Sequence, residues 1–155
     1  MQSKSKNSST KKIGGTNILS FDFGETKIGI AIGNHTTKTS HPLTTIMTAN
    51  KVLRLKAIEV LINDWSPGLI VIGLPLNEDG SESRLTLLAK RFSEKIINKF
   101  NIPTALIDER YTSVEAESLL SASNGKFKKK DGVIDQVAAQ IILESYFERI
   151  TNDIS

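Results

Sequence analysis

The run Leu69 to Leu74 most constrains how this chain can fold, because it is rich in β-branched residues and contains no polar side chain. Such a run is typical of a strand that is covered on both faces, as in parallel sheets flanked by helices. Apolar residues recur at helical spacing on either side of it, over 51–66 and 82–100. The pattern therefore predicts an α/β fold with residues 69–74 as the central strand.

The remaining apolar segments supply the other elements of this fold. Further strands are expected at 18–24, 27–33, 41–48 and 103–108, and helices at 51–66 (N-cap Asn50), 82–100 (N-cap Ser81), 112–120 and 134–150. The first two strands are separated by a tight turn and should pair as a hairpin, and Pro42 suits an edge or the beginning of the third strand. The sum is a mixed five-stranded sheet flanked by helices.

Charge divides the chain into an arm and a domain. Residues 1–16 hold four lysines and no acid, which is typical of a flexible basic arm, whereas 17–150 form the folded domain and 151–155 a short tail. Without these four lysines, the 20 basic residues fall to 16, against 17 acidic ones. Affinity for nucleic acid would therefore come from local basic patches rather than from the total charge.

The chain contains no cysteine, which excludes disulfides, thiolate metal sites and a cysteine nucleophile. It also has no apolar run near the roughly 20 residues of a membrane span and no secretory signal pattern. These observations predict a cytoplasmic protein that is not bound to a membrane.

Two positions place carboxylates where apolar residues are expected. Asp22 lies between Phe21 and Phe23 inside a strand, where a desolvated carboxylate costs several kcal/mol unless it is paired or binds a metal. Asp108 and Glu109 follow another strand, at the kind of strand end where open α/β sheets bind ligands. Alternation allows only one of the two on a given face, and the spacing does not decide which. A lysine partner for Asp22 and ordinary loop polarity for Glu109 are the simpler alternatives.

A third carboxylate, Asp135, stands one turn into the last helix. The small residues Ala138 and Ala139 on the same face would let the helix backbone approach the sheet and bring Asp135 with it, although a favourable contact with the helix dipole would also explain an acid there. If the three carboxylates converge, a cation must join them, and hard oxygen ligands favour Mg²⁺ or Mn²⁺. Two such ions about 4 Å apart are typical of phosphodiester hydrolysis.

Basic residues near these positions could hold a nucleic acid. Five side chains are candidate phosphate contacts outside the helices: Arg110, Lys126, Lys128, Lys129 and Lys130. The four lysines surround Phe127 in a polar loop, which would allow both phosphate binding and base stacking, although a solvated charge run is the simpler explanation. Arg84, near a helix start after the loop 73–81, is a further candidate.

Four segments together resemble the YqgF family of Holliday junction resolvases, which are also described as nucleases that mature the small-subunit ribosomal RNA precursor. The segments are Phe21-Asp22-Phe23-Gly24, residues 73–81, Asp108-Glu109-Arg110-Tyr111-Thr112-Ser113 and Asp135-Gln136-Val137-Ala138-Ala139. The resemblance covers 17–150 and implies an RNase H-like fold. It also implies that Asp22, Glu109 and Asp135 are the catalytic carboxylates. Joining this to the two-ion chemistry above, we expect the three side chains to bind two Mg²⁺ or Mn²⁺ ions, with Asp22 bridging them.

The resemblance implies a magnesium-dependent endonuclease that acts on structured nucleic acid, either precursor ribosomal RNA or branched DNA. The ribosome is a further candidate partner, and both monomer and homodimer remain open. The alternative is a nucleic-acid or ribosome-binding module without catalysis. Residues 22–27 also resemble the first phosphate loop of the actin and sugar-kinase ATPases, but the sequence lacks their second phosphate loop, their adenosine motif and their length.

Overall fold

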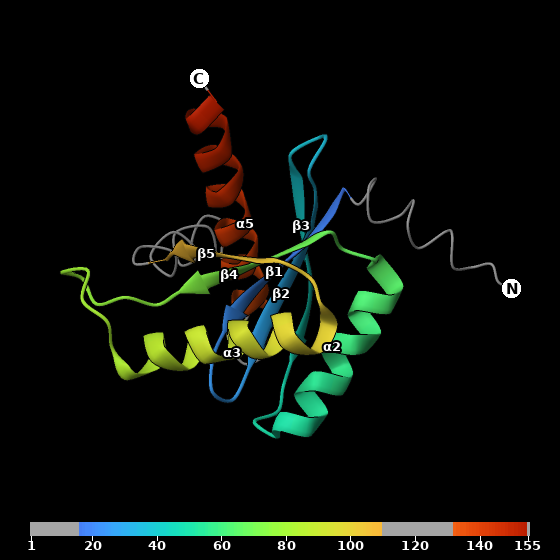
Figure 1. Cartoon of the computed structure of the whole chain (residues 1–155), viewed down its shortest axis with the longest axis vertical. Helices are drawn as coiled ribbons and strands as arrows, with labels where there is room; N and C mark the ends of the chain where they lie inside the picture. Colours follow the sequence, from blue (N-terminus) through green and yellow to red (C-terminus); the bar gives the residue numbers. More distant parts are fainter. Residues whose placement is uncertain (1–15, 110–131, 155) are drawn as a thin grey trace, which may run out of the picture.

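One five-stranded sheet organises residues 16–109 and 132–154, which are the residues described by the computed structural model (Figure 1). In chain order the elements are β1 (Asn17–Phe23), β2 (Ile28–Asn34), β3 (Thr39–Ile46), α2 (Lys51–Trp65), β4 (Leu69–Leu74), α3 (Arg84–Phe100), β5 (Thr104–Asp108) and α5 (Val133–Ile154). The strand order is β3-β2-β1-β4-β5. Strands β1, β2 and β3 pair antiparallel, whereas β1, β4 and β5 are parallel. The predicted mixed sheet is confirmed.

Helices cover both faces of this sheet (Figure 1). Helices α2 and α3 cover one face, where Ile58, Phe92 and Ile96 pack on inward residues of the strands such as Phe21. Helix α5 covers the other face, where its residues 142, 143 and 147 pack on the strands. Because successive strand residues point to opposite faces, each strand residue belongs either to the α2/α3 face or to the α5 face.

The prediction that residues 69–74 form the central strand is wrong by one place in the strand order. Strand β4 is buried, with Ile70, Val71 and Ile72 fully covered, but the middle of the sheet is β1. A continuous apolar sequence indicates that a strand is covered on both faces. All interior strands of a sheet are covered in this way, so such a sequence does not identify the middle strand. Pro42 lies inside β3 rather than at its start; β3 is an edge strand, and the register against β2 shifts beside this position.

The helix ends partly follow the prediction. Asn50 caps α2, since its Oδ1 accepts the Leu53 amide at 3.0 Å. Ser81 is not a cap; its hydroxyl and amide bind Asp79, and α3 begins two residues later, capped by Ser83. Ser83 is the cap because its side chain accepts from the Thr86 amide, while the Thr86 side chain accepts from the Ser83 amide.

Helix α5 continues to Ile154, four residues past the predicted end at Ile150, because no glycine or proline interrupts the sequence there. The expected helix at 112–120 and residues 1–15 of the basic arm lie outside the described residues. Among the helices described, none combines the length and the apolar character needed to cross a membrane.

Candidate active site

Asp22 points to the α5 face of the sheet. Along β1, Ile18 packs against α5 and the Ser20 hydroxyl donates to the Ala139 carbonyl oxygen of α5 at 2.6 Å. Asp22 is the next residue on this face, at the carboxyl end of the strand. The small residues Ala138 and Ala139 are buried against the sheet, so the predicted close approach of this helix is confirmed.

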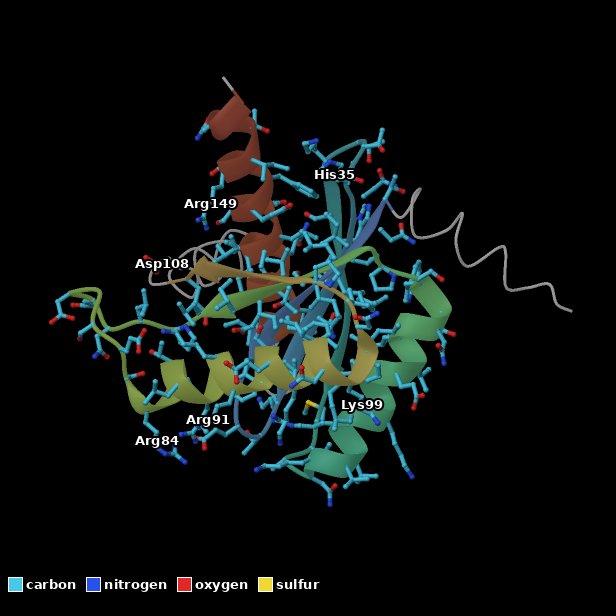
Figure 2. All side chains as sticks on the ribbon, viewed as in Figure 1. His35, Arg84, Arg91, Lys99, Asp108 and Arg149 are labelled. Atoms are coloured by element: carbon cyan, nitrogen blue, oxygen red, sulfur yellow. The ribbon has the colours of Figure 1, made fainter. Side chains whose placement is uncertain are left out.

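Glu109, and not Asp108, joins Asp22. Ile107 belongs to the core beneath α5, and the Glu109 amide donates to the Leu74 carbonyl oxygen at 3.2 Å, which extends the strand pairing by one residue. Alternation therefore places Glu109 on the α5 face, where its carboxyl group hydrogen-bonds that of Asp22. Asp108 is exposed at the end of β5 (Figure 2).

The first turn of α5 brings Asp135 to the same face. The Thr45 hydroxyl of β3 donates to the Gly132 carbonyl oxygen at 2.7 Å and accepts from the Gln136 side chain at 3.1 Å, which fixes the start of the helix. The Lys27 ammonium lies 3.8 Å from Asp135 Oδ2, too far for a hydrogen bond. This buried oxygen has no hydrogen-bond partner among the residues that the structure describes.

Two glycines clear the space around Asp22. Gly29 pairs directly with Asp22 across the sheet, and a Cβ atom on it would lie 2.0 Å from the Asp135 carbonyl oxygen. A Cβ atom on Gly73 of β4 would lie 2.8 Å from Glu109 Oε1. The absence of side chains at these two positions therefore lets both other carboxylates approach Asp22. Sequence reasoning missed this role, although a glycine inside each of two apolar strands is a visible signal.

We call Asp22, Glu109 and Asp135 the carboxylate site. Its electrostatics are those of negative groups that lack enough positive charge nearby. Burial raises the pKa of Asp22 to about 7, and the nearby Asp135 charge adds to this increase. Burial together with the charge of Asp22 raises the pKa of Glu109 to about 9. Burial also raises the pKa of Asp135, against the opposing effect of Lys27. Near neutral pH, Asp22 and Glu109 therefore share a proton in the metal-free protein.

The oxygen ligands and the negative charge of the carboxylate site suit a divalent cation. Within 16–109 and 132–154, no three Asp, Glu, His or Cys side chains form a complete metal centre: Asp22 and Glu109 touch, whereas Asp135 acts on Asp22 through its charge. Yet the unpartnered Asp135 Oδ2 and the desolvated pair would all gain from a cation. An all-oxygen donor set favours Mg²⁺ or Mn²⁺.

Of the candidate phosphate contacts, Arg84 lies in the described part of the chain. Arg84 begins α3 and is exposed (Figure 2), and its Nη1 donates to Glu25 Oε1 at 2.8 Å. Arg110 and the four lysines Lys126, Lys128, Lys129 and Lys130 lie outside the described residues.

Comparison with known proteins places these features in context. A family model described as "RuvX: Holliday junction resolvase" matches residues 16–149. A protein of Nitrosospira multiformis named "Putative pre-16S rRNA nuclease" is 46% identical over 131 residues, covering 84% of this chain and 87% of the relative. A protein of the same name from Nitrosomonas europaea is 45% identical over 131 residues, covering 84% and 88%.

The fold is also found among solved structures. Thermus thermophilus RuvC in complex with a Holliday junction substrate has a TM-score of 0.54 at 11% identity, covering 88% of this chain and 96% of that chain. The yeast mitochondrial Holliday junction resolvase has a TM-score of 0.51 at 11% identity, covering 99% and 88%. At this identity the likeness concerns the fold, and it confirms the predicted RNase H-like class.

Proposed function

The chain belongs to the RuvX family of Holliday junction resolvases, and on this premise we propose that it is a metal-dependent endonuclease that hydrolyses phosphodiester bonds of structured nucleic acid. The observation that carries the proposal is the contact of Asp22 with Glu109, beside Asp135, in a space cleared by Gly29 and Gly73. Desolvated carboxylates in contact are costly for stability, so a catalytic role gives a reason for their presence.

The proposed natural substrate is the precursor of 16S ribosomal RNA, cut near the 5′ end of the mature sequence in the cytoplasm. Relatives above 40% identity that carry the name of this activity support the assignment. Branched DNA is the second candidate substrate, supported by the description of the family model.

In the proposed mechanism Asp22, Glu109 and Asp135 would together hold two divalent cations, Mg²⁺ or Mn²⁺, through their carboxylate oxygens. When bound, such ions supply Lewis-acid chemistry: they lower the pKa of water and offset charge on the phosphate. Binding requires Asp22 and Glu109 to release the proton that they share, and the Lys27 ammonium partly opposes the rise that burial causes in the pKa of Asp135.

Basic side chains would position the nucleic-acid strand at these carboxylates. We assign this role to Arg84, which would exchange its Glu25 partner for a phosphate, and to Arg110 with the four lysines of residues 126–130. A surface ion pair such as that of Arg84 is weak enough to be exchanged in this way.

The test compares the full chain with its Asp22→Asn variant on precursor 16S ribosomal RNA and on a four-way DNA junction, each with and without Mg²⁺. Cleavage by the wild type alone, only with Mg²⁺ and leaving 5′-phosphate ends, is expected. Equal behaviour of the two proteins on both substrates would contradict the catalytic assignment. Tight binding without any cleavage, indifferent to Mg²⁺, would instead favour the non-catalytic binding module.

A further inference from the structure

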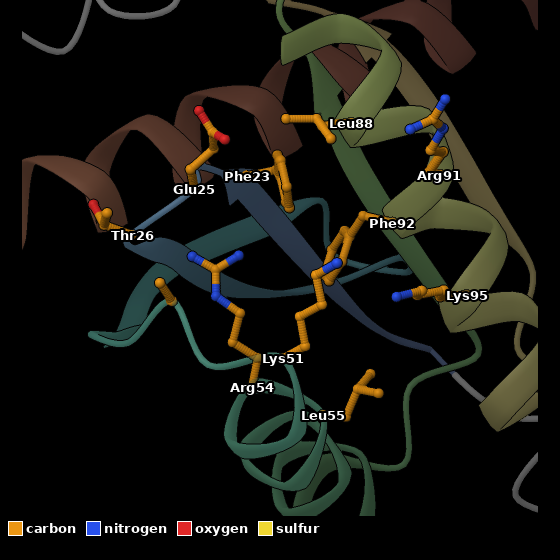
Figure 3. A pocket seen from close by; sticks show the side chains of 11 residues that line it. Phe23, Glu25, Thr26, Lys51, Arg54, Leu55, Leu88, Arg91, Phe92 and Lys95 are labelled. Carbon is orange, nitrogen blue, oxygen red and sulfur yellow. The ribbon is translucent and has the colours of Figure 1, made fainter. Parts of the chain in front are cut away.

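A pocket of about 430 Å³ lies on the α2/α3 face of the sheet, away from the face that carries the carboxylates (Figure 3). Three parts of the chain line it: the end of β1 with the turn that follows, the first turns of α2, and the middle of α3. Lys51, Arg54 and Leu55 share one face of α2 by their spacing. We call this cavity the basic pocket.

The inner wall of the basic pocket is apolar and partly aromatic. The ring of Phe23 packs against that of Phe92, with centroids 4.9 Å apart, and Leu55 and Leu88 extend the wall. The two rings are tilted by 35° to each other, and aromatic surface of this kind makes favourable contacts with other planar rings. The volume is within the range of small-molecule sites.

The rim of the basic pocket is positively charged. Four of the lining residues are basic: Lys51, Arg54, Arg91 and Lys95. Figure 3 shows Lys51 reaching into the pocket from α2 and Lys95 from α3. The only acid of the lining is Glu25, which is already paired with Arg84, and no described carboxylate forms a salt bridge with any of the four cations.

Arg54 is the most informative of these cations because it is 6% exposed. Its Nε and Nη2 donate to the carbonyl oxygens of Thr48 and Gly24 at 2.6 and 2.7 Å, and its guanidinium lies over the Phe23 ring at 5.7 Å. Both hydrogen-bond acceptors are neutral, and burial lowers the pKa of Arg54 although the nearby Glu25 charge opposes this effect, so burying this cation is costly. An anionic ligand in the pocket would compensate this charge.

We propose that the basic pocket binds an unpaired nucleotide, with the base on the wall of Phe23 and Phe92 and the phosphate between Lys51, Arg54 and Lys95. Planar rings joined to a phosphate match both parts of the pocket, since single-stranded nucleic acids are held by aromatic stacking and basic side chains together. An acidic peptide would match the rim but leave the aromatic wall unused. The site lies beyond the proposed nuclease function, because binding here uses none of the three carboxylates.

The test measures equilibrium binding to the full chain without divalent ions, so that no cleavage is needed. The probes are uridine and adenosine 5′-monophosphates, a ten-nucleotide single-stranded RNA, inorganic phosphate and an oligoglutamate peptide. The monophosphates distinguish a free nucleotide from a nucleotide within a strand. We expect the nucleotides to bind at least tenfold more tightly than phosphate alone, with amide NMR shifts at Phe23, Leu55 and Leu88.

The charge-reversal variant Lys51→Glu/Lys95→Glu should lower the affinity for RNA at least tenfold and reduce the salt dependence of binding by about one contact per lysine. The matched control is Lys56→Glu/Lys99→Glu, which makes the same charge change on the same helices outside the pocket and should alter the affinity less than twofold. The binding assay contains no divalent ion and detects no cleavage, so that this proposal and the nuclease can fail separately.

Three results would overturn the proposal. The two double variants could lose affinity equally, phosphate or oligoglutamate could bind as tightly as the nucleotides, or nucleotides could bind without shifts at the pocket wall. Thermal denaturation of each variant, with midpoints close to that of the wild type, ensures that lost binding reflects the pocket rather than unfolding.

Discussion

At the end of β1 two consecutive residues point to opposite faces of the sheet, and the sites on these two faces carry opposite charge. Asp22 faces α5 and belongs to a site with too many carboxylates, whereas Phe23 faces α2 and α3 and belongs to a pocket with unpaired cations. Both regions carry charges that the described part of the chain leaves uncompensated, and each is built on a rigid strand end. The sign of the uncompensated charge therefore agrees with the ligand that we propose for each face, a cation at the carboxylates and an anion in the basic pocket.

The largest expected effect is the loss of nuclease activity when the carboxylate site on the α5 face is changed. Asp22→Asn removes the carboxylate that both neighbours share and should reduce cleavage by about a thousandfold or more, since each tenfold corresponds to about 1.4 kcal/mol. Product formation from precursor ribosomal RNA in Mg²⁺ measures it. The matched control is Asp108→Asn, on the exposed side of β5, which should stay within about threefold of the wild type. Comparable losses in the two variants would contradict the assignment.

The next effect tests the space around Asp22. Gly29→Ala would place a Cβ atom 2.0 Å from the Asp135 carbonyl oxygen, so the first turn of α5 must move, and we expect about 2–4 kcal/mol of lost stability together with most of the activity. Gly73→Ala meets only side-chain ends, of Ile142 and Glu109, and should cost less. Denaturant unfolding ranks the two variants, and the opposite ranking would show that α5 adapts easily.

The carboxylate site and the basic pocket differ in how much of each could be predicted from the sequence. A carboxylate inside an apolar strand singled out Asp22, and the small residues Ala138 and Ala139 indicated that the last helix approaches the sheet with Asp135, so both carboxylates could be proposed from the pattern alone. The choice between Asp108 and Glu109 was not, because β5 is apolar on both faces and its alternation carries no signal. The basic pocket was also missed, since its residues come from three segments that only the tertiary fold brings together.

A smaller effect concerns stability and pH. The folded-state pKa of Glu109 lies near 9 against an ordinary 4.5, so over this interval the unfolded chain is ionised while the folded one holds its proton. The stability of the metal-free protein should therefore fall as pH rises from about 4.5 to 9. Glu109→Gln removes this penalty and should stabilise the fold by roughly 1–3 kcal/mol at pH 8 and not at pH 4.

Thermal denaturation at the two pH values, with and without Mg²⁺, measures this difference. Mg²⁺ should stabilise the wild type more than Glu109→Gln, since only the wild type gains a full complement of charged ligands. The variant Lys51→Glu/Lys95→Glu should show the same pH profile as the wild type, because its changes lie on the other face. A Glu109→Gln protein less stable than the wild type at pH 8 would show that the carboxyl pair stabilises the fold.

The smallest effect concerns Lys27, which forms a salt bridge with the carboxylate site within the described part of the chain. Its ammonium lies 3.8 Å from Asp135 Oδ2 with both side chains partly exposed, so the pair should contribute less than about 1 kcal/mol. In Lys27→Met the pKa of Asp135 should rise, yet Mg²⁺ no longer competes with an ammonium for that oxygen. The variant also removes the repulsion between the Lys27 ammonium and a bound cation, and we expect half-saturation at pH 8 to need about two- to fivefold less Mg²⁺. A higher Mg²⁺ requirement would instead mean that Lys27 serves chiefly to keep Asp135 ionised.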